Sequence, residues 1–193
     1  MLHPALALLE FDSIAAGILA GDAMVKTAPV ARIVAGTVHP GKYLVMVTGD
    51  VAPVQEALAA GLLTGSGALL DQVFLPGVHP AVPAAIAAAR QPQIDEALGI
   101  VETGSAAAAI AAADAGLKAA QVSLLELRLA DGLGGKGLLF FAGAVSDVEA
   151  ALDAGCAAIE SSGQLVNAVT IPQLHREMAA SLSSSTRFRA LVG

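Results

Sequence analysis

The sequence predicts an α+β protein built from two tandem copies of one ferredoxin-like domain, each with the order β-α-β-β-α-β. The first observation behind this prediction is an internal repeat, because matched residues recur in the same order in both halves. The matched pairs are Glu10 and Glu102, Asp22 and Asp114, and Lys26 and Lys118, 92 residues apart; Lys42 and Lys136, Gly49 and Gly143, and Gly61 and Gly155, 94 apart; and Pro76 and Pro172, and His79 and His175, 96 apart. A separation that grows only at short insertions is typical of a duplicated domain. The second observation is that each half alternates short apolar runs with helical segments.

The first copy begins with ALALLE (5–10), an apolar run typical of a strand. Ser13 can cap a helix that runs to about Lys26. The remaining elements expected in this copy are strands at 30–38 and 42–49, joined by the turn signal HPG, a helix at 51–63 and a strand at 69–76.

The second copy is expected to fold in the same way. Its expected elements are a strand at 97–102, a helix at 105–119, strands at 122–130 and 136–142, a helix at 145–159 and a strand at 165–171. A short helix is expected after the last strand of each copy, near 79–89 and 173–180. The predicted domains are 4–90 and 96–180, with a polar linker at 90–96 and a loosely held tail at 181–193.

The composition indicates that much of the surface is covered in an assembly. The chain of 193 residues is 55% hydrophobic and 14% charged, whereas soluble domains carry roughly 25% charged residues. A membrane-spanning helix needs about 20 apolar residues, and charged residues such as Asp114 and Lys118 interrupt the apolar runs. The net charge of −7, without a basic cluster, argues against nucleic acid as a partner. Cys156 is alone, so the chain forms no internal disulfide, and we expect a buried thiol on a helix.

The motifs of common enzymes are missing from the sequence. It has no Gly-x-Ser-x-Gly elbow, phosphate-binding loop or His-Glu-x-x-His pair. The segment GLGGK (132–136) lacks the spacing of a phosphate-binding loop. We therefore expect no enzyme activity and no cofactor.

Four phrases of the second copy, ALGIVET, AAIAAADAGLKAA, GGKGLLFFAGAVSDVEAAL and VTIPQLH, strongly resemble the bacterial microcompartment shell domain. The first copy carries a weaker version in ALALLE, GDAMVKTA, PGKYLVMVTGDVAPVQEAL and VFLPGVH. The resemblance covers about residues 5–178 and is greatest to tandem-domain shell proteins with the unpermuted order of elements, of the propanediol-utilisation type.

This resemblance implies a flat homotrimer with pseudo-hexagonal symmetry and a central pore for metabolites. Such a tile assembles with hexameric and pentameric shell proteins around encapsulated enzymes, in the shell of a cytoplasmic microcompartment. Two other readings stay open: a soluble ferredoxin-like regulator that binds a small ligand, and a redox carrier with a metal in the pore.

The resemblance also implies roles for residues at the edge of the tile. Lys26 and Lys118, in the motif D-A-x-x-K-x-A, are expected to lie against neighbouring tiles, and the alternative is a solvated lysine at a helix end. Asp22 and Asp114 lie four residues earlier and can pair with these lysines. The histidines of the two P-x-x-H motifs are expected at the rim, or else at helix starts; they are His79 and His175.

The loops 38–42 and 130–136 are expected to line the pore. The pore-lining residues implied by the resemblance are His39, Pro40, Gly41, Asp131, Gly132, Leu133 and Gly134. Some family members hold a metal cluster on the axis through a cysteine in this loop, but this chain has His39 there. We therefore expect no thiolate-held cluster. A site of three His39 imidazoles is chemically allowed, but an exposed turn histidine is favoured.

Overall fold

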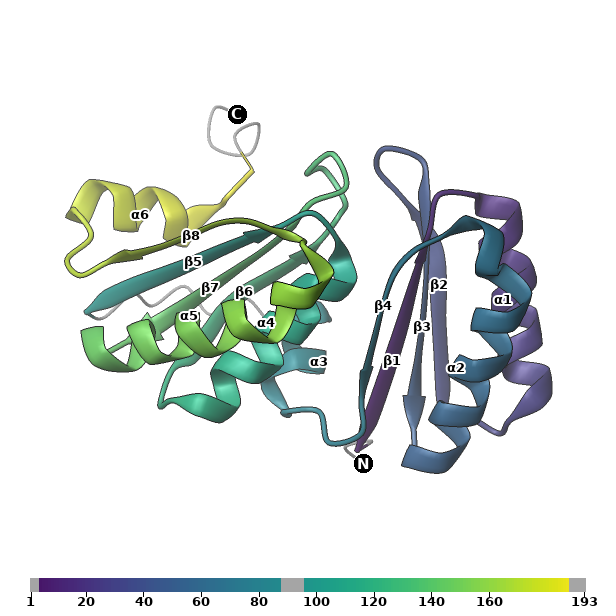
Figure 1. The fold of residues 1–193 in the computed structure, drawn as a ribbon. Helices are drawn as coiled ribbons and strands as arrows, with labels where there is room; N and C mark the ends of the chain where they lie inside the picture. Colours follow the sequence, from purple (N-terminus) through teal and green to yellow (C-terminus); the bar gives the residue numbers. More distant parts are fainter. Residues whose placement is uncertain (1–3, 88–95, 188–193) are drawn as a thin grey trace.

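The computed structural model describes residues 4–87 and 96–187, which form two domains with the same architecture (Figure 1). The elements of the first domain are β1 (Ala5–Phe11), α1 (Ile14–Thr27), β2 (Arg32–Val38), β3 (Lys42–Gly49), α2 (Val51–Gly65), a 3-10 turn (Ser66–Ala68), β4 (Leu69–Leu75) and α3 (Ala81–Ile86). Those of the second are β5 (Ala97–Thr103), α4 (Ala106–Ala119), β6 (Ser123–Leu129), β7 (Gly137–Gly143), α5 (Val145–Ile159), a 3-10 turn (Glu160–Ser162), β8 (Leu165–Ile171) and α6 (Arg176–Ser184).

Each domain has one antiparallel sheet of four strands, in the orders β2-β3-β1-β4 and β6-β7-β5-β8. Two helices cover one face of each sheet, α1 and α2 in the first domain and α4 and α5 in the second (Figure 1). This arrangement confirms the predicted ferredoxin-like order and the tandem repeat. The repeat separation grows at two places: the β6–β7 connection, which is longer than the β2–β3 connection, and Gly163–Gln164 before β8.

Serine caps the first helix of each domain, as predicted for Ser13. The Ser13 hydroxyl accepts a hydrogen bond from the amide of Ala16, at 3.3 Å. Ser105 caps α4 in the same way through the amide of Ala108, at 3.1 Å. These bonds satisfy amides that have no partner within the helix, and they fix where α1 and α4 begin.

The prediction for the end of the chain needs a correction. The helix expected at 173–180 begins at Arg176 and continues to Ser184, so it extends into the segment expected to be a loosely held tail. The side chain of Thr186 is also hydrogen-bonded to β6. Residues 188–193 of that tail, and the predicted linker except residue 96, lie outside the described residues.

Alternate residues of β1 belong to two different hydrophobic clusters. Leu9 and Phe11 pack with the first domain's own helices, whereas Leu6 and Leu8 belong to the same cluster as the alanines of α4 in the second domain. The core of the second domain therefore continues across the domain interface. In the described part of the chain, no helix is both long enough and apolar enough to cross a membrane.

Candidate functional site

The interface between the two domains is a candidate functional site because it buries most of one helix. Helix α4 packs against α5 and its own sheet, and also against β4, β1 and α3 of the first domain. Ala106 and Ile110 of α4 are completely buried, and Val73 of β4 is 8% exposed. Alanine at most positions of α4 removes the bulk that would keep two sheets apart, so the helix fits between them.

A buried carboxylate joins the two domains at the start of α4. Glu10 is 0% exposed, and one of its oxygens accepts a hydrogen bond from the amide of Ala106 at 2.7 Å. Its other oxygen lies 2.6 Å from the ammonium of Lys42. Lys42 also donates to the carbonyl oxygen of Gly135, at 3.3 Å. The positive end of the helix dipole and the lysine together compensate a charge that would otherwise be costly to bury.

Two further hydrogen bonds connect the first domain to α4. The Ser105 hydroxyl donates to the carboxylate of Asp71 on β4. The backbone amide of His79 donates to the carboxylate of Asp114, at 2.7 Å. The interface is therefore held at both ends of α4, with apolar packing between them.

The elements equivalent to this interface are exposed elsewhere on the chain. Ile110 corresponds to Ile18, which is 54% exposed, and Val73 corresponds to Val169, which is 40% exposed. The face that contains Ile18 corresponds to the buried face of α4, and we call it the α1/β2 surface; its exposed apolar residues are Ile14, Ile18, Leu19, Val25, Ile33 and Val34. The face that contains Val169 corresponds to the part of the first domain that contacts α4, and we call it the β8/α6 surface; its exposed apolar residues are Leu165, Val166, Val169 and Met178.

Each predicted edge lysine forms the expected ion pair with the aspartate four residues earlier in the sequence. The Lys26 ammonium lies 2.6 Å from Asp22, and both side chains are exposed. The Lys118 ammonium lies 2.5 Å from Asp114, whose side chain is only 6% exposed because the His79 loop covers it. The two lysines therefore stand in different surroundings in the single chain.

The predicted rim histidines both lie at helix starts, which was the alternative to a rim role. The Nδ1 atom of His175 accepts from the amide of Glu177 at 3.3 Å, and His175 is the N-cap of α6. The Nδ1 atom of His79 accepts from the amide of Ala81 at 3.3 Å, just before α3. Both side chains thus have a local structural role, whatever they contact in an assembly.

The predicted pore-lining residues come together in one place, which we call the loop cluster (residues 39–41 and 130–136). The Nδ1 atom of His39 lies 2.9 Å from a carboxylate oxygen of Asp131, and both side chains are exposed. The hydrogen bond from His39 lowers the pKa of Asp131; partial desolvation opposes this, and the positive charges of His39, Arg187 and Arg128 lower the pKa further. Gly132 and Gly134 have φ of 72° and 63°, a conformation that favours glycine.

The residues that carry the most buried contact of the interface had no predicted role. These are Glu10 and Lys42, and their counterparts Glu102 and Lys136 also form a pair, at 2.6 Å. The sequence contained a signal for these pairs. In both copies, an acidic residue ends the first strand and a lysine follows the glycine-containing loop. Among the described residues, no group of three or more acidic, histidine or cysteine side chains is arranged to hold a metal ion.

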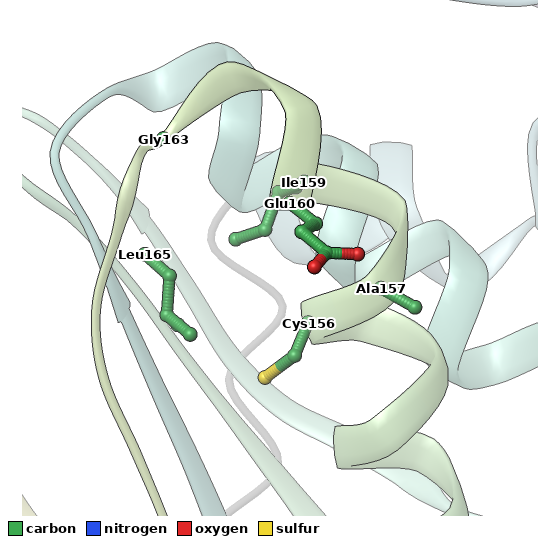
Figure 2. Close-up of a pocket in the computed structure, with 6 residues that line it drawn as sticks. All are labelled: Cys156, Ala157, Ile159, Glu160, Gly163 and Leu165. Atoms are coloured by element: carbon green, nitrogen blue, oxygen red, sulfur yellow. The ribbon is translucent and has the colours of Figure 1, made fainter.

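Cys156 lines a shallow cavity of about 330 Å³ between the end of α5 and the start of β8, together with Glu160 and Leu165 (Figure 2). The thiol is only partly buried, which corrects the expectation of a buried cysteine. Partial burial and, next, the charge of Asp153 raise the pKa of the thiol. A protonated thiol is a poor nucleophile, so this cysteine is chemically quiet.

Comparison with known proteins identifies both domains. The family model described as the BMC domain matches twice, at residues 5–78 and 97–174. The chain is 42% identical over 177 residues to the bacterial microcompartment shell protein PduT of Citrobacter freundii, covering 92% of this chain and 96% of that protein. It is 40% identical over 83 residues to the single-domain-sized shell protein EutM of Salmonella typhimurium, covering 43% of this chain and 84% of that protein.

A solved structure has the same fold over nearly the whole chain. It is the crystal structure of a microcompartment protein from Desulfitobacterium hafniense, with a TM-score of 0.80 and 42% sequence identity. The match covers 93% of this chain and 99% of that one.

Proposed function

Because the chain belongs to the BMC-domain family of bacterial microcompartment shell proteins, we propose that it is a trimeric tile of such a shell. Three chains would supply six BMC domains to one flat ring. The observation that carries this proposal is the domain interface, since the chain leaves both halves of an equivalent interface exposed. In this arrangement, the β8/α6 surface of one chain packs on the α1/β2 surface of the next.

The exposed apolar residues support this packing. Ile18 and Val169 occupy the positions of Ile110 and Val73, which are buried between the domains. Most of the exposed large apolar side chains among the described residues lie on these two surfaces. A surface with this many exposed large apolar side chains is typical of an interaction site.

The polar residues of the domain interface have counterparts on the same two surfaces. Glu102 corresponds to Glu10, and in the tile its carboxylate would accept from the start of α1 in the next chain. The amide of His175 would likewise donate to Asp22 of that chain, as the amide of His79 does to Asp114. The partly exposed pair of Glu102 and Lys136 would then be buried like the pair of Glu10 and Lys42.

A head-to-tail contact of this type forms a closed ring when each step turns by the appropriate angle. The strands of the two domains diverge from the loop cluster (Figure 1), which supports an axis beside that cluster. Three copies of each loop would then surround a central pore. We propose that His39, Pro40, Gly41 and residues 131–134 line this pore.

We further propose that Lys26 and Lys118 lie at the outer edge and contact neighbouring tiles. Completion of the ring would cover Asp22 as the His79 loop covers Asp114, so the two lysines would become equivalent. The partners would be the hexameric and pentameric shell proteins and, on one face, encapsulated enzymes. The role is structural and not catalytic, and the metabolite that crosses the pore is set by the loop cluster.

Sedimentation equilibrium at micromolar concentration tests the tile directly. The wild-type chain should have the mass of a trimer. Val169→Asp should be monomeric but folded, because it would bury an unpaired carboxylate at each interface. Leu63→Asp is the control, since Leu63 is 83% exposed on α2, outside both surfaces, and it should remain trimeric. A monomeric wild-type chain contradicts the proposal.

A further inference from the structure

The C-terminal segment Ser185–Arg187 is attached to the loop cluster through one arginine. The hydroxyl of Thr186 accepts a hydrogen bond from Arg128 at 3.2 Å and donates to Glu126 at 2.8 Å. Arg128 also donates to the backbone carbonyl of Asp131, at 3.3 Å. A continuous series of polar contacts therefore runs from the C-terminal segment to the loop 130–136.

The series continues into the first domain. The carboxylate of Asp131 lies 2.9 Å from Nδ1 of His39, and the charge of Arg187 helps to lower the pKa of Asp131. Arg187 and Asp131 line one cavity of about 420 Å³ with Val38, the residue before His39. The C-terminal segment is thus within reach of both loops of the cluster.

The glycine-rich loop 130–136 is the longer of the two loops in the cluster. Ala130, Gly132, Gly134 and Gly135 all have positive φ, and glycine loses more conformational freedom on ordering than other residues. Five backbone hydrogen bonds lie within residues 129–136, including Leu133 to Ala130 at 3.0 Å and Lys136 to Leu133 at 3.3 Å. Because these bonds are local, the position of the loop relative to its surroundings depends on the contacts of Arg128, His39 and Lys42.

The first domain has no arginine at the position equivalent to Arg128. In the β2–β3 ladder, Gly36 stands opposite Leu44, where Arg128 stands opposite Leu138 in the second domain. The domain fold itself therefore does not require the arginine. Its presence in one copy alone indicates a role for the second loop that the first loop does not have.

We propose that the C-terminal segment is a strap that holds the loop 130–136 in place through Arg128. Release of Thr186 from Arg128 frees the loop and changes the position of Asp131 relative to His39. The contacts belong to a single chain, but the effect on a pore rests on the proposed tile. The strap thereby connects one face of the tile, where the C-terminal segment lies, to the residues at its axis.

Hydrogen exchange followed by mass spectrometry tests the strap on the full chain. Thr186→Val keeps the shape of the side chain and removes the hydroxyl. It should speed the exchange of amides 130–136 by about tenfold or more, because the hydrogen bonds of Thr186 to two charged side chains are lost. Thr186→Ser should restore the slow rate. Thr64→Val, which makes the same substitution at an exposed threonine of α2, is the matched control and should change nothing in this loop.

The imidazole signals of His39, His79 and His175 give a second readout by nuclear magnetic resonance. In Thr186→Val, the signal of His39 should move while the other two stay unchanged. Loop exchange and a His39 signal identical to the wild type would overturn the strap. The mass of the assembly reports separately on the tile, because a monomeric chain with the expected exchange pattern would refute the tile and retain the strap.

Discussion

Ile18 and Ile110 occupy equivalent positions in the two copies and allow the proposed interface to be tested with matched substitutions. Ile110 is completely buried within one chain, whereas Ile18 is 54% exposed. Replacement of Ile110 by Ala should destabilise the chain by about 2–5 kcal/mol, the range for large apolar residues truncated in a core. The loss should not depend on protein concentration, because both sides of that contact belong to the same chain.

Replacement of Ile18 by Ala should act on assembly instead. Complete burial of an isoleucine side chain contributes about 1.5–3 kcal/mol, and roughly half of this side chain remains to be buried. Each interface should therefore lose about 1 kcal/mol, and a ring with three such interfaces about 3 kcal/mol. The association constant of the trimer should fall on the order of a hundredfold, and any cavity left behind would add to this loss.

Two measurements separate these effects. Urea unfolding followed by circular dichroism reports on the chain, and sedimentation equilibrium over a range of concentrations reports on the trimer. Leu63→Ala is the matched control, because Leu63 is 83% exposed on α2 and should change neither quantity. A trimeric protein whose association constant is unaffected by Ile18→Ala would show that α1 is not in the interface and would refute the reasoning from the repeat.

Three other predictions follow from the site. Lys26→Ala combined with Lys118→Ala should leave a folded trimer but prevent extended sheets, observed by electron microscopy; sheets that form as before in the same salt would exclude the edge role. The lowered pKa of Asp131 means that its contact with His39 stabilises the folded state above pH 3.8 and is lost as the pH falls through the lowered value; a carboxylate titration with a midpoint at or above 3.8 would contradict this. Cys156 should be alkylated with a midpoint above pH 9.0, because its pKa is raised, and Asp153→Asn should lower that midpoint; full reactivity at pH 8 would refute the assignment.

Much of the fold could be read from the sequence because its signals are local or repeated. The strands and helices follow from apolar patterning and from the serine caps, and the predicted bounds at 42–49, 145–159 and 165–171 match the structure. The duplicated order of matched residues predicted two domains with the same topology. The helix after β8 was predicted too short, because its end is fixed partly by contacts of the C-terminal segment with β6, which no local pattern contains.

The candidate site was predicted only in part. The two loops meet in the structure, because equivalent turns of a repeated domain lie at the same end of the domain interface, and their role in lining a pore stays a prediction. The pairing of His39 with Asp131 was not predicted, because these residues are 92 positions apart and are brought together by the packing of the two domains. The attachment of Thr186 to Arg128 was not predicted either, because these residues are 58 positions apart and meet only when the second domain has folded.

The sequence by itself determined which elements form and that they form twice, because periodicity, capping and repetition act within short segments or between aligned ones. The tertiary structure alone decided that α4 is buried and α1 is exposed, although the two helices have equivalent positions in the repeat. The physical reason is connectivity: one chain can pack its first domain against its second, but its second domain finds an equivalent partner only in another chain. Glu10 is therefore buried against the start of α4, while Glu102 still has one third of its side chain exposed.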